Sequence, residues 1–244
     1  MRNVDHEDEG PSLRRWWREN LRQAGLAPTC RRLVAGIGDF VRESTPGQRR
    51  QRYGDAGYDW DYRVDTTSAT VGWRERLLGA LYSPYQATEP ELFAEMLSAI
   101  GIDFRGFTFI DVGSGKGRVL LMAADYPFLR ILGVELLPAL HRIARENIRE
   151  YKSDRQQCCS IESICQDGRD FEFPAEPTVL YLFNPLPEAG LVRVLGNLER
   201  SLRDVPRRVH VIYHNPLLEH VLAGSPALRR TGGTHQYVVY SNAS

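Results

Sequence analysis

The chain has 244 residues, which suits one large domain or one domain with a smaller appendage. Hydrophobic residues make up 42% of it and charged residues 25%, as in ordinary globular proteins, and the formal net charge is zero. This balance gives no support to nucleic acid or an anionic membrane as a partner. Only Lys116 and Lys152 among the 31 basic residues are lysines, a bias that we interpret as a sign of a bacterial genome.

Targeting and metal-binding signals are absent from the sequence. Residues 1–10 are acidic and lack the apolar region of a signal peptide, and no run of 18 apolar residues occurs. The four cysteines form no CxxC pair and have no histidine close by in sequence, so reduced structural thiols are expected rather than a metal site. The sequence therefore predicts a soluble, cytoplasmic protein with no metal.

The first 88 residues differ in character from the rest. Helical stretches over 13–41 are broken at Pro28, and an aromatic and aspartate-rich segment follows over 53–62. This region is too short and too polar for an independent domain. We predict an N-terminal helical and loop extension over residues 1–88, which covers part of a catalytic domain spanning residues 89–244.

From residue 107 onward, short apolar runs alternate with helical patterns. The helices are expected over 117–126, 138–151 and 188–202, and the strands over 107–112, 131–135, 158–164, 178–183, 209–213 and 235–240. Strands and helices that alternate in this way predict a doubly wound α/β sheet. The run over 178–183 is nearly all apolar, as expected for a parallel strand that is covered on both faces.

A glycine-rich turn follows the first expected strand. Gly113, Gly115 and Gly117 stand at every second position after Asp111, and a helical pattern begins at Arg118. Glycine accepts positive φ and lets a ligand lie against the main chain. The spacing fits neither the dinucleotide fingerprint, whose third glycine would fall at Arg118, nor the phosphate-binding P-loop. An ordinary glycine-rich turn is the remaining alternative.

The spacing D-x-G-x-G-x-G resembles motif I of the class I S-adenosylmethionine-dependent methyltransferases. This resemblance implies a Rossmann-like sheet of seven strands, S-adenosylmethionine as the cofactor and no metal. It also implies that residues of the turn contact the cofactor, namely Asp111, Gly113, Ser114, Gly115 and Gly117.

Two further acids stand where such a cofactor needs them. Glu135 ends the second expected strand, 22 residues after Gly113, where a carboxylate can accept hydrogen bonds from both ribose hydroxyls. The resemblance places another acid after the third strand, against the adenine amino group. Asp167 matches this position, and Asp170 in the same loop competes with it. An Asp that caps the loop is the structural alternative.

The fourth expected strand ends in Asn184-Pro185-Leu186-Pro187, which resembles motif IV of amine-methylating class I enzymes. A carboxamide oxygen and a nearby carbonyl can accept two N–H bonds from an amine, and proline stiffens the turn. Leu186 and Pro187 depart from the usual second proline and aromatic residue, so methylation of a stacked base is not expected. A structural Asn-Pro turn is the alternative for Asn184.

Upstream, the segment over 83–93 resembles the loop that precedes motif I in the non-SET histone lysine methyltransferases. Tyr85 and Thr88 match its tyrosine and threonine, and Gln86 departs from its glycine. The resemblance implies that this loop closes over the methionine end of the cofactor. His214, after the fifth expected strand, is either an acceptor for a proton of the nucleophile or an incidental residue of a second Asn-Pro turn.

Taken together, these motifs predict a methyltransferase that acts on an amine nitrogen of a protein or a small molecule. Asn184 and Tyr85 are the predicted catalytic residues, and Thr88, Glu135 and Asp167 complete the predicted cofactor site. The altered motif IV keeps one alternative open, a non-catalytic scaffold or sensor that binds the cofactor. The methyl acceptor is not identified by any motif.

Overall fold

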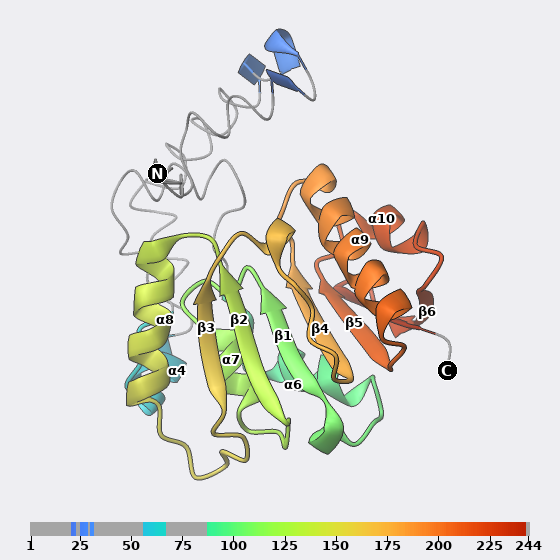
Figure 1. Cartoon of the computed structure of the whole chain (residues 1–244). Helices are drawn as coiled ribbons and strands as arrows, with labels where there is room; N and C mark the ends of the chain where they lie inside the picture. The colour runs from blue at the N-terminus through green and yellow to red at the C-terminus, as the bar shows by residue number, and fades with distance from the viewer. Residues whose placement is uncertain (1–20, 23–24, 29, 32–55, 67–86, 243–244) are drawn as a thin grey trace, which may run out of the picture.

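A computed structural model describes residues 21–22, 25–28, 30–31, 56–66 and 87–242 (Figure 1). Within these residues, no helix is long and apolar enough to cross a lipid bilayer. The predicted boundary between an extension over 1–88 and a domain over 89–244 stays a prediction.

A single mixed sheet forms the centre of the molecule, with the strand order β3-β2-β1-β4-β5-β7-β6 (Figure 1). Strands β1 to β5 are mutually parallel, whereas β7 runs antiparallel to both of its neighbours. The strands are β1 (Thr108–Val112), β2 (Arg130–Glu135), β3 (Ile161–Cys165), β4 (Thr178–Phe183), β5 (Val209–His214), β6 (Arg229–Gly233) and β7 (Tyr237–Ser241). The predicted seven-stranded, doubly wound α/β sheet is confirmed.

Helices cover both faces of this sheet and enclose two separate apolar cores. One core contains side chains of α6 and α7, and the other contains those of α9 and α10. Strand β4 divides its residues between them, because Val179 and Tyr181 face the first core and Leu180 and Leu182 the second. The helices are α4 (Ala56–Tyr62), α6 (Pro90–Ser98), α7 (Arg118–Ala123), α8 (Pro138–Glu150), α9 (Glu188–Asp204) and α10 (Glu219–Ala223), and the short 3₁₀ turns are η2 (Phe104–Gly106) and η3 (Gly168–Asp170).

Two strands differ from the sequence prediction. Strand β3 begins at Ile161 rather than at Cys158, although Cys158 is buried and Cys159 exposed. The sequence does not predict strand β6, because its residues RRTGG carry no apolar alternation. It forms by pairing with β7, whose own residues are buried. Pairing with a neighbouring strand thus makes this segment a strand, although its residues have no intrinsic preference for strand conformation.

The order of the strands reverses between β1 and β4. The chain passes from β1 outward to β2 and β3 and then returns to add β4 on the opposite side of β1. Crevices that bind ligands open at such a switch point, beyond the carboxyl ends of the parallel strands. The glycine turn follows β1, Glu135 ends β2 and Asn184 follows β4, all at this end of the sheet.

Close packing beneath the glycine turn requires a glycine in the neighbouring strand. A Cβ atom added to Gly133 of β2 would lie 2.5 Å from Leu120 Cδ1 and 2.9 Å from Ser114 Cβ. The absence of a side chain at Gly133 therefore lets the turn and the first residues of α7 settle directly on β2.

Replacing Gly133 with Ala should destabilise the protein by about 1–3 kcal/mol, because the added methyl group overpacks this contact. Urea denaturation measures the change. Gly196 of α9 is the matched control, since a Cβ there meets nothing within 4 Å. Gly196→Ala should raise stability by about 0.5–1 kcal/mol through helix propensity. Equal effects at the two positions would contradict the packing argument.

Candidate functional site

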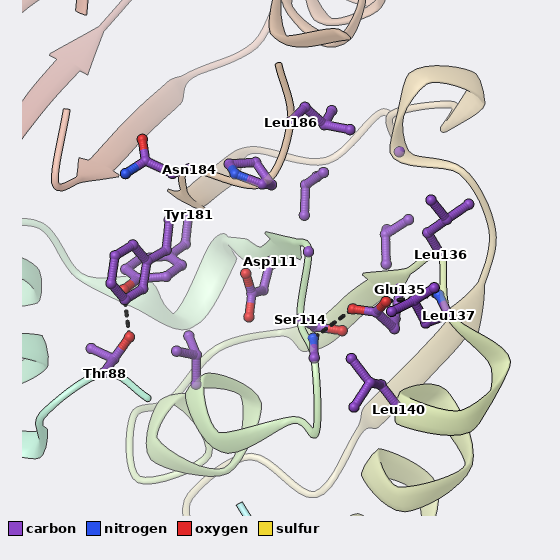
Figure 2. A pocket seen from close by; sticks show the side chains of 18 of the residues that line it. Thr88, Asp111, Ser114, Glu135, Leu136, Leu137, Leu140, Tyr181, Asn184 and Leu186 are labelled. Carbon is purple, nitrogen blue, oxygen red and sulfur yellow. Dashed lines mark hydrogen bonds between the residues drawn. The ribbon is translucent and has the colours of Figure 1, made fainter. Parts of the chain in front are cut away.

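A cavity opens at the switch point, between the glycine turn and the loops after β2, β3, β4 and β5 (Figure 2). Predicted site residues from five separate stretches of the chain meet in its wall. They are Thr88, Asp111, Gly113, Ser114, Gly115, Glu135, Asp167 and Asn184. Leucines complete the wall, among them Leu136, Leu137, Leu140 and Leu186.

The glycine turn uses the conformational freedom of all three of its glycines. Gly113, Gly115 and Gly117 have φ of 88°, 55° and 85°, in the left-handed region that L side chains rarely adopt. The turn is tied to β2 by Gly113 N–H, which donates to the Val134 carbonyl at 2.8 Å. Gly117 lies at the start of α7 and does not belong to the cavity wall. Gly117 therefore shapes the turn from outside the cavity wall.

Glu135 fixes the turn from the end of β2. Its Oε2 accepts a hydrogen bond from Gly115 N–H at 2.7 Å, and its Oε1 accepts one from Leu137 N–H at 2.7 Å. Burial raises the pKa of the Glu135 carboxyl, and these backbone donors oppose the rise. Because a carboxylate can accept about four hydrogen bonds, Glu135 keeps further lone pairs for a ligand.

Asp111 lies in the same cavity without such support (Figure 2). It is 3% exposed, and no hydrogen bond to its carboxylate comes from any residue that the structure describes. Burial, and then the nearby Glu135 charge, hold the pKa of Asp111 well above its ordinary value. The hydroxyl of Ser114 is buried too, and it has no hydrogen-bond partner in the described part of the chain. Polar groups left unsatisfied in this way are costly unless a ligand completes them.

A buried polar chain leads away from the cavity through Thr88. Thr88 Oγ1 lies 2.9 Å from Tyr181 Oη, which lies 2.8 Å from His214 Nδ1 (Figure 2 shows the first pair). The His214 ring stacks on Phe183 at 3.9 Å between centroids. Burial lowers the pKa of His214 to about 4, so its ring is neutral at pH 7. His214 is not in the cavity wall, and Tyr181 stands between it and Thr88.

Asn184 directly follows β4 and has an unusual backbone conformation, with φ of 44°. Asn tolerates this left-handed region better than most residues. Its side-chain Oδ1 accepts a hydrogen bond from Tyr213 Oη at 2.8 Å, and Tyr213 Oη in turn accepts one from Leu218 N–H at 3.3 Å. The carboxamide is therefore held in one orientation, and its oxygen keeps a second lone pair.

The two acids after β3 are separated by the structure. Asp167 is 8% exposed and lies in the cavity wall, where it caps η3 and forms an ion pair with Arg169. Asp170 forms an ion pair with Arg193 and is absent from the wall. Of the two acids that compete for the adenine amino group, Asp167 is therefore the one whose position fits. Both of its carboxylate oxygens already accept hydrogen bonds from Arg169.

Tyr85 lies outside the described residues, so its predicted place at the site stays a prediction. No group of three or more His, Cys, Asp or Glu side chains in the described part of the chain is arranged to hold a metal ion. Sequence reasoning missed Tyr181, Tyr213 and Arg118, which the structure connects to the site. The signal for Tyr181 is its polar hydroxyl in a strand that is otherwise nearly all apolar, two residues before Phe183 and on the same face.

The strand order identifies the architecture. Parallel strands in the order 3-2-1-4-5, followed by an antiparallel β7 between β5 and β6, surround a cavity above a glycine-rich β1–α7 turn. The chain has the class I S-adenosylmethionine-dependent methyltransferase fold.

No protein-family model matches the sequence. No curated protein matches it either. Solved structures of methyltransferases do resemble it, at low identity. An RNA methyltransferase from Salinibacter ruber in complex with S-adenosyl-L-homocysteine is 22% identical, with a TM-score of 0.43 over 64% of this chain and 92% of that one. A SAM-dependent methyltransferase from Aquifex aeolicus is 13% identical, with a TM-score of 0.46 over 64% and 98%.

A ribosomal protein L11 methylase from Lactobacillus delbrueckii subsp. bulgaricus is 15% identical, with a TM-score of 0.44 over 65% of this chain and 80% of that one. The methyl acceptors named for these structures thus include RNA and protein. Fold similarity of this kind does not distinguish between acceptors.

Replacing Asp111 with Asn should stabilise the unliganded protein at neutral pH. The raised folded-state pKa means that ionising Asp111 costs more free energy in the folded state than in the unfolded chain. Stability of the wild type therefore falls as pH rises from the unfolded-state pKa, about 3.9, through the folded-state pKa. The Asn variant lacks this loss.

Thermal unfolding of both proteins across this pH range measures the difference. The melting temperature of Asp111→Asn should exceed that of the wild type at neutral pH, by about 2–4 °C for each kcal/mol, and the gap should close in acid. A variant that is less stable at every pH would show that the carboxylate has a partner in the folded protein.

Proposed function

We propose that the chain is an S-adenosylmethionine-dependent methyltransferase that transfers the methyl group to an amine nitrogen of a protein side chain or a small molecule. The observation that carries this proposal is the pairing of Asp111 and Glu135 at the carboxyl ends of β1 and β2, in one cavity. The buried Asp111 carboxylate has no hydrogen-bond partner among the described residues, and Glu135 has spare lone pairs.

These residues suit a ligand with an ammonium group, a ribose and an aromatic base. Asp111 would accept the ammonium group, which satisfies its carboxylate, and Glu135 would accept the two ribose hydroxyls. The glycine turn offers a wall without side chains, and the Ser114 hydroxyl would gain a partner. Asp167 would lie beside the base, with Leu136 and Leu186 against its faces. Thr88 would border the methionine end.

The bound cofactor would supply an activated methyl group on its sulfonium. The residues of this chain would align a nucleophile with it and exclude water. Asn184 would accept an N–H of the amine on the second lone pair of its Oδ1, while the Tyr213 bond holds the carboxamide still. Pro185 would stiffen this turn, which also packs against Gly113. Tyr85 would close over the cofactor.

The alternative is a scaffold or sensor that binds the cofactor without catalysis. It is favoured by one feature, the replacement of the usual motif IV residues by Leu186 and Pro187. Transfer of a tritiated methyl group from labelled cofactor into a fractionated lysate separates the two functions. The enzyme would label at least one fraction, and the scaffold would label none while still binding the cofactor.

Replacing Glu135 with Ala should lower the affinity for S-adenosylmethionine by about tenfold or more, because hydrogen bonds to a charged group contribute roughly 1.5–3 kcal/mol. The variant also loses the bond that holds Gly115, which adds to the effect. Titration calorimetry measures the affinity. Glu162 of β3, exposed and outside the cavity wall, provides the control variant Glu162→Ala. An effect below twofold at Glu135 would show that the ribose lies elsewhere.

Replacing Asn184 with Ala should leave cofactor affinity nearly unchanged and slow methyl transfer strongly, since its contact to the nucleophile forms mainly in the transition state. Tyr213→Phe keeps Asn184 but removes the bond that orients it, so it should slow transfer by a smaller factor. Methyl transfer into the labelled lysate fraction measures both rates. Full activity of Asn184→Ala would remove this residue from the chemistry and return Asn184-Pro185 to a structural turn.

A further inference from the structure

The two cations next to the glycine turn do not serve as a phosphate site. Lys116 is completely buried, and its Nζ lies 2.8 Å from Asp65 Oδ1. Arg118 is 2% exposed; its Nε donates to the Thr88 carbonyl at 2.9 Å and its Nη1 to Thr66 Oγ1 at 3.3 Å. Both side chains therefore point toward residues that precede the first strand in sequence, namely Asp65, Thr66 and Thr88.

Asn147 of α8 also connects residue 65 to the glycine turn. Both its side-chain oxygen and its side-chain nitrogen form hydrogen bonds to the backbone. Its Oδ1 accepts from Asp65 N–H at 2.8 Å, and its Nδ2 donates to the Asp65 carbonyl at 2.9 Å. The same Nδ2 also donates to the Lys116 carbonyl at 2.9 Å. Asn147 is 4% exposed, so none of these bonds is easily replaced by water. One side chain thus joins the backbone of residue 65 to the backbone of the glycine turn.

Aromatic contacts extend the same attachment along α4. The Arg118 guanidinium lies over the Tyr58 ring at 4.3 Å from its centroid, and Tyr62 packs between Tyr58 and Tyr151 with centroid distances of 4.7 and 5.3 Å. Arg155 donates to Tyr62 Oη at 2.7 Å. Residues 58–66 are therefore attached to the turn, to α8 and to the segment after it.

We propose that Lys116, Arg118 and Asn147 form a clasp that holds residues 58–66 against the glycine turn and thereby sets the geometry in which the turn binds its ligand. Cofactor binding and attachment of residues 58–66 are then thermodynamically coupled, and each strengthens the other. Lys116, Asn147 and Asp65 lie outside the cavity wall, so they act as positioning residues. The proposal rests on the proposed cofactor site.

The clasp also explains why two cationic residues, Lys116 and Arg118, stand in and directly after the glycine turn. A buried Lys and a buried Arg are rare unless they are paired, and here each has partners in the upstream segment. Arg118 bonds both Thr66 and Thr88, so it fixes Thr88 in the cavity wall while it fastens residue 66. On this account residues 58–66 support the cofactor site from outside its wall.

Binding of S-adenosylhomocysteine to Asn147→Leu tests the clasp. Titration calorimetry should show a dissociation constant raised about tenfold or more, although residue 147 does not touch the cavity. Asn242→Leu is the matched control. Asn242 likewise accepts a hydrogen bond from a backbone N–H, that of Val209, and donates one to a backbone carbonyl, that of Arg207. These bonds lie at the amino end of β5, whereas the cavity lies at its carboxyl end. Loss of Asn242 should leave the dissociation constant within twofold.

Hydrogen exchange of the wild-type protein provides a test that needs no variant. Saturating S-adenosylhomocysteine should slow exchange of the amides of residues 64–66 by about tenfold or more, as reciprocity requires. Unchanged exchange there, or wild-type affinity of a folded Asn147→Leu protein, would overturn the clasp. If the wild type itself fails to bind S-adenosylhomocysteine, the proposed cofactor site fails instead, and the two failures are thereby distinguished.

Discussion

The carboxylate of Glu135 is the group on which the cavity at the switch point depends. It joins the end of β2 to the glycine turn through Gly115 N–H and to the start of α8 through Leu137 N–H. The turn can reach this carboxylate only because Gly133, two residues earlier in β2, has no side chain to push it away. A buried acid that is held by backbone donors therefore organises three elements at one point. Asp111, 3% exposed beside it, receives no such hydrogen bond from the residues that the structure describes, and its carboxylate is the group that a ligand would satisfy.

Stability and binding oppose each other at this site. Asp111 carries a raised pKa because burial penalises its charged form, which is the form that a cationic ligand needs. Tyr181 and Thr88 illustrate the contrasting case, since their hydroxyls satisfy each other and His214 inside the core. A protein without a ligand to bind would gain stability from a neutral residue at 111. A ligand-binding function that offsets this cost would explain a buried carboxylate at position 111.

Much of the fold and part of the site could be predicted from the sequence. Strands β1, β2, β4 and β5 are mostly apolar, and the glycine spacing marks the turn, so these features depend on local sequence. Strand β6 could not be located, because RRTGG becomes a strand only through β7. The partners of Lys116 and Arg118 could not be predicted either, since Asp65 and Thr66 are about 50 residues away and no local pattern relates them. Such contacts arise from tertiary packing.

Titration of the protein with S-adenosylhomocysteine, in buffers of different ionisation enthalpy, tests the central claim most directly. If the Asp111 carboxylate accepts the ligand's ammonium group, binding must lower the raised pKa of Asp111 and release protons. The account predicts proton release that Asp111→Asn abolishes, and an affinity that rises with pH through the folded-state pKa. Absence of binding, or binding with the same proton release in Asp111→Asn, would contradict it.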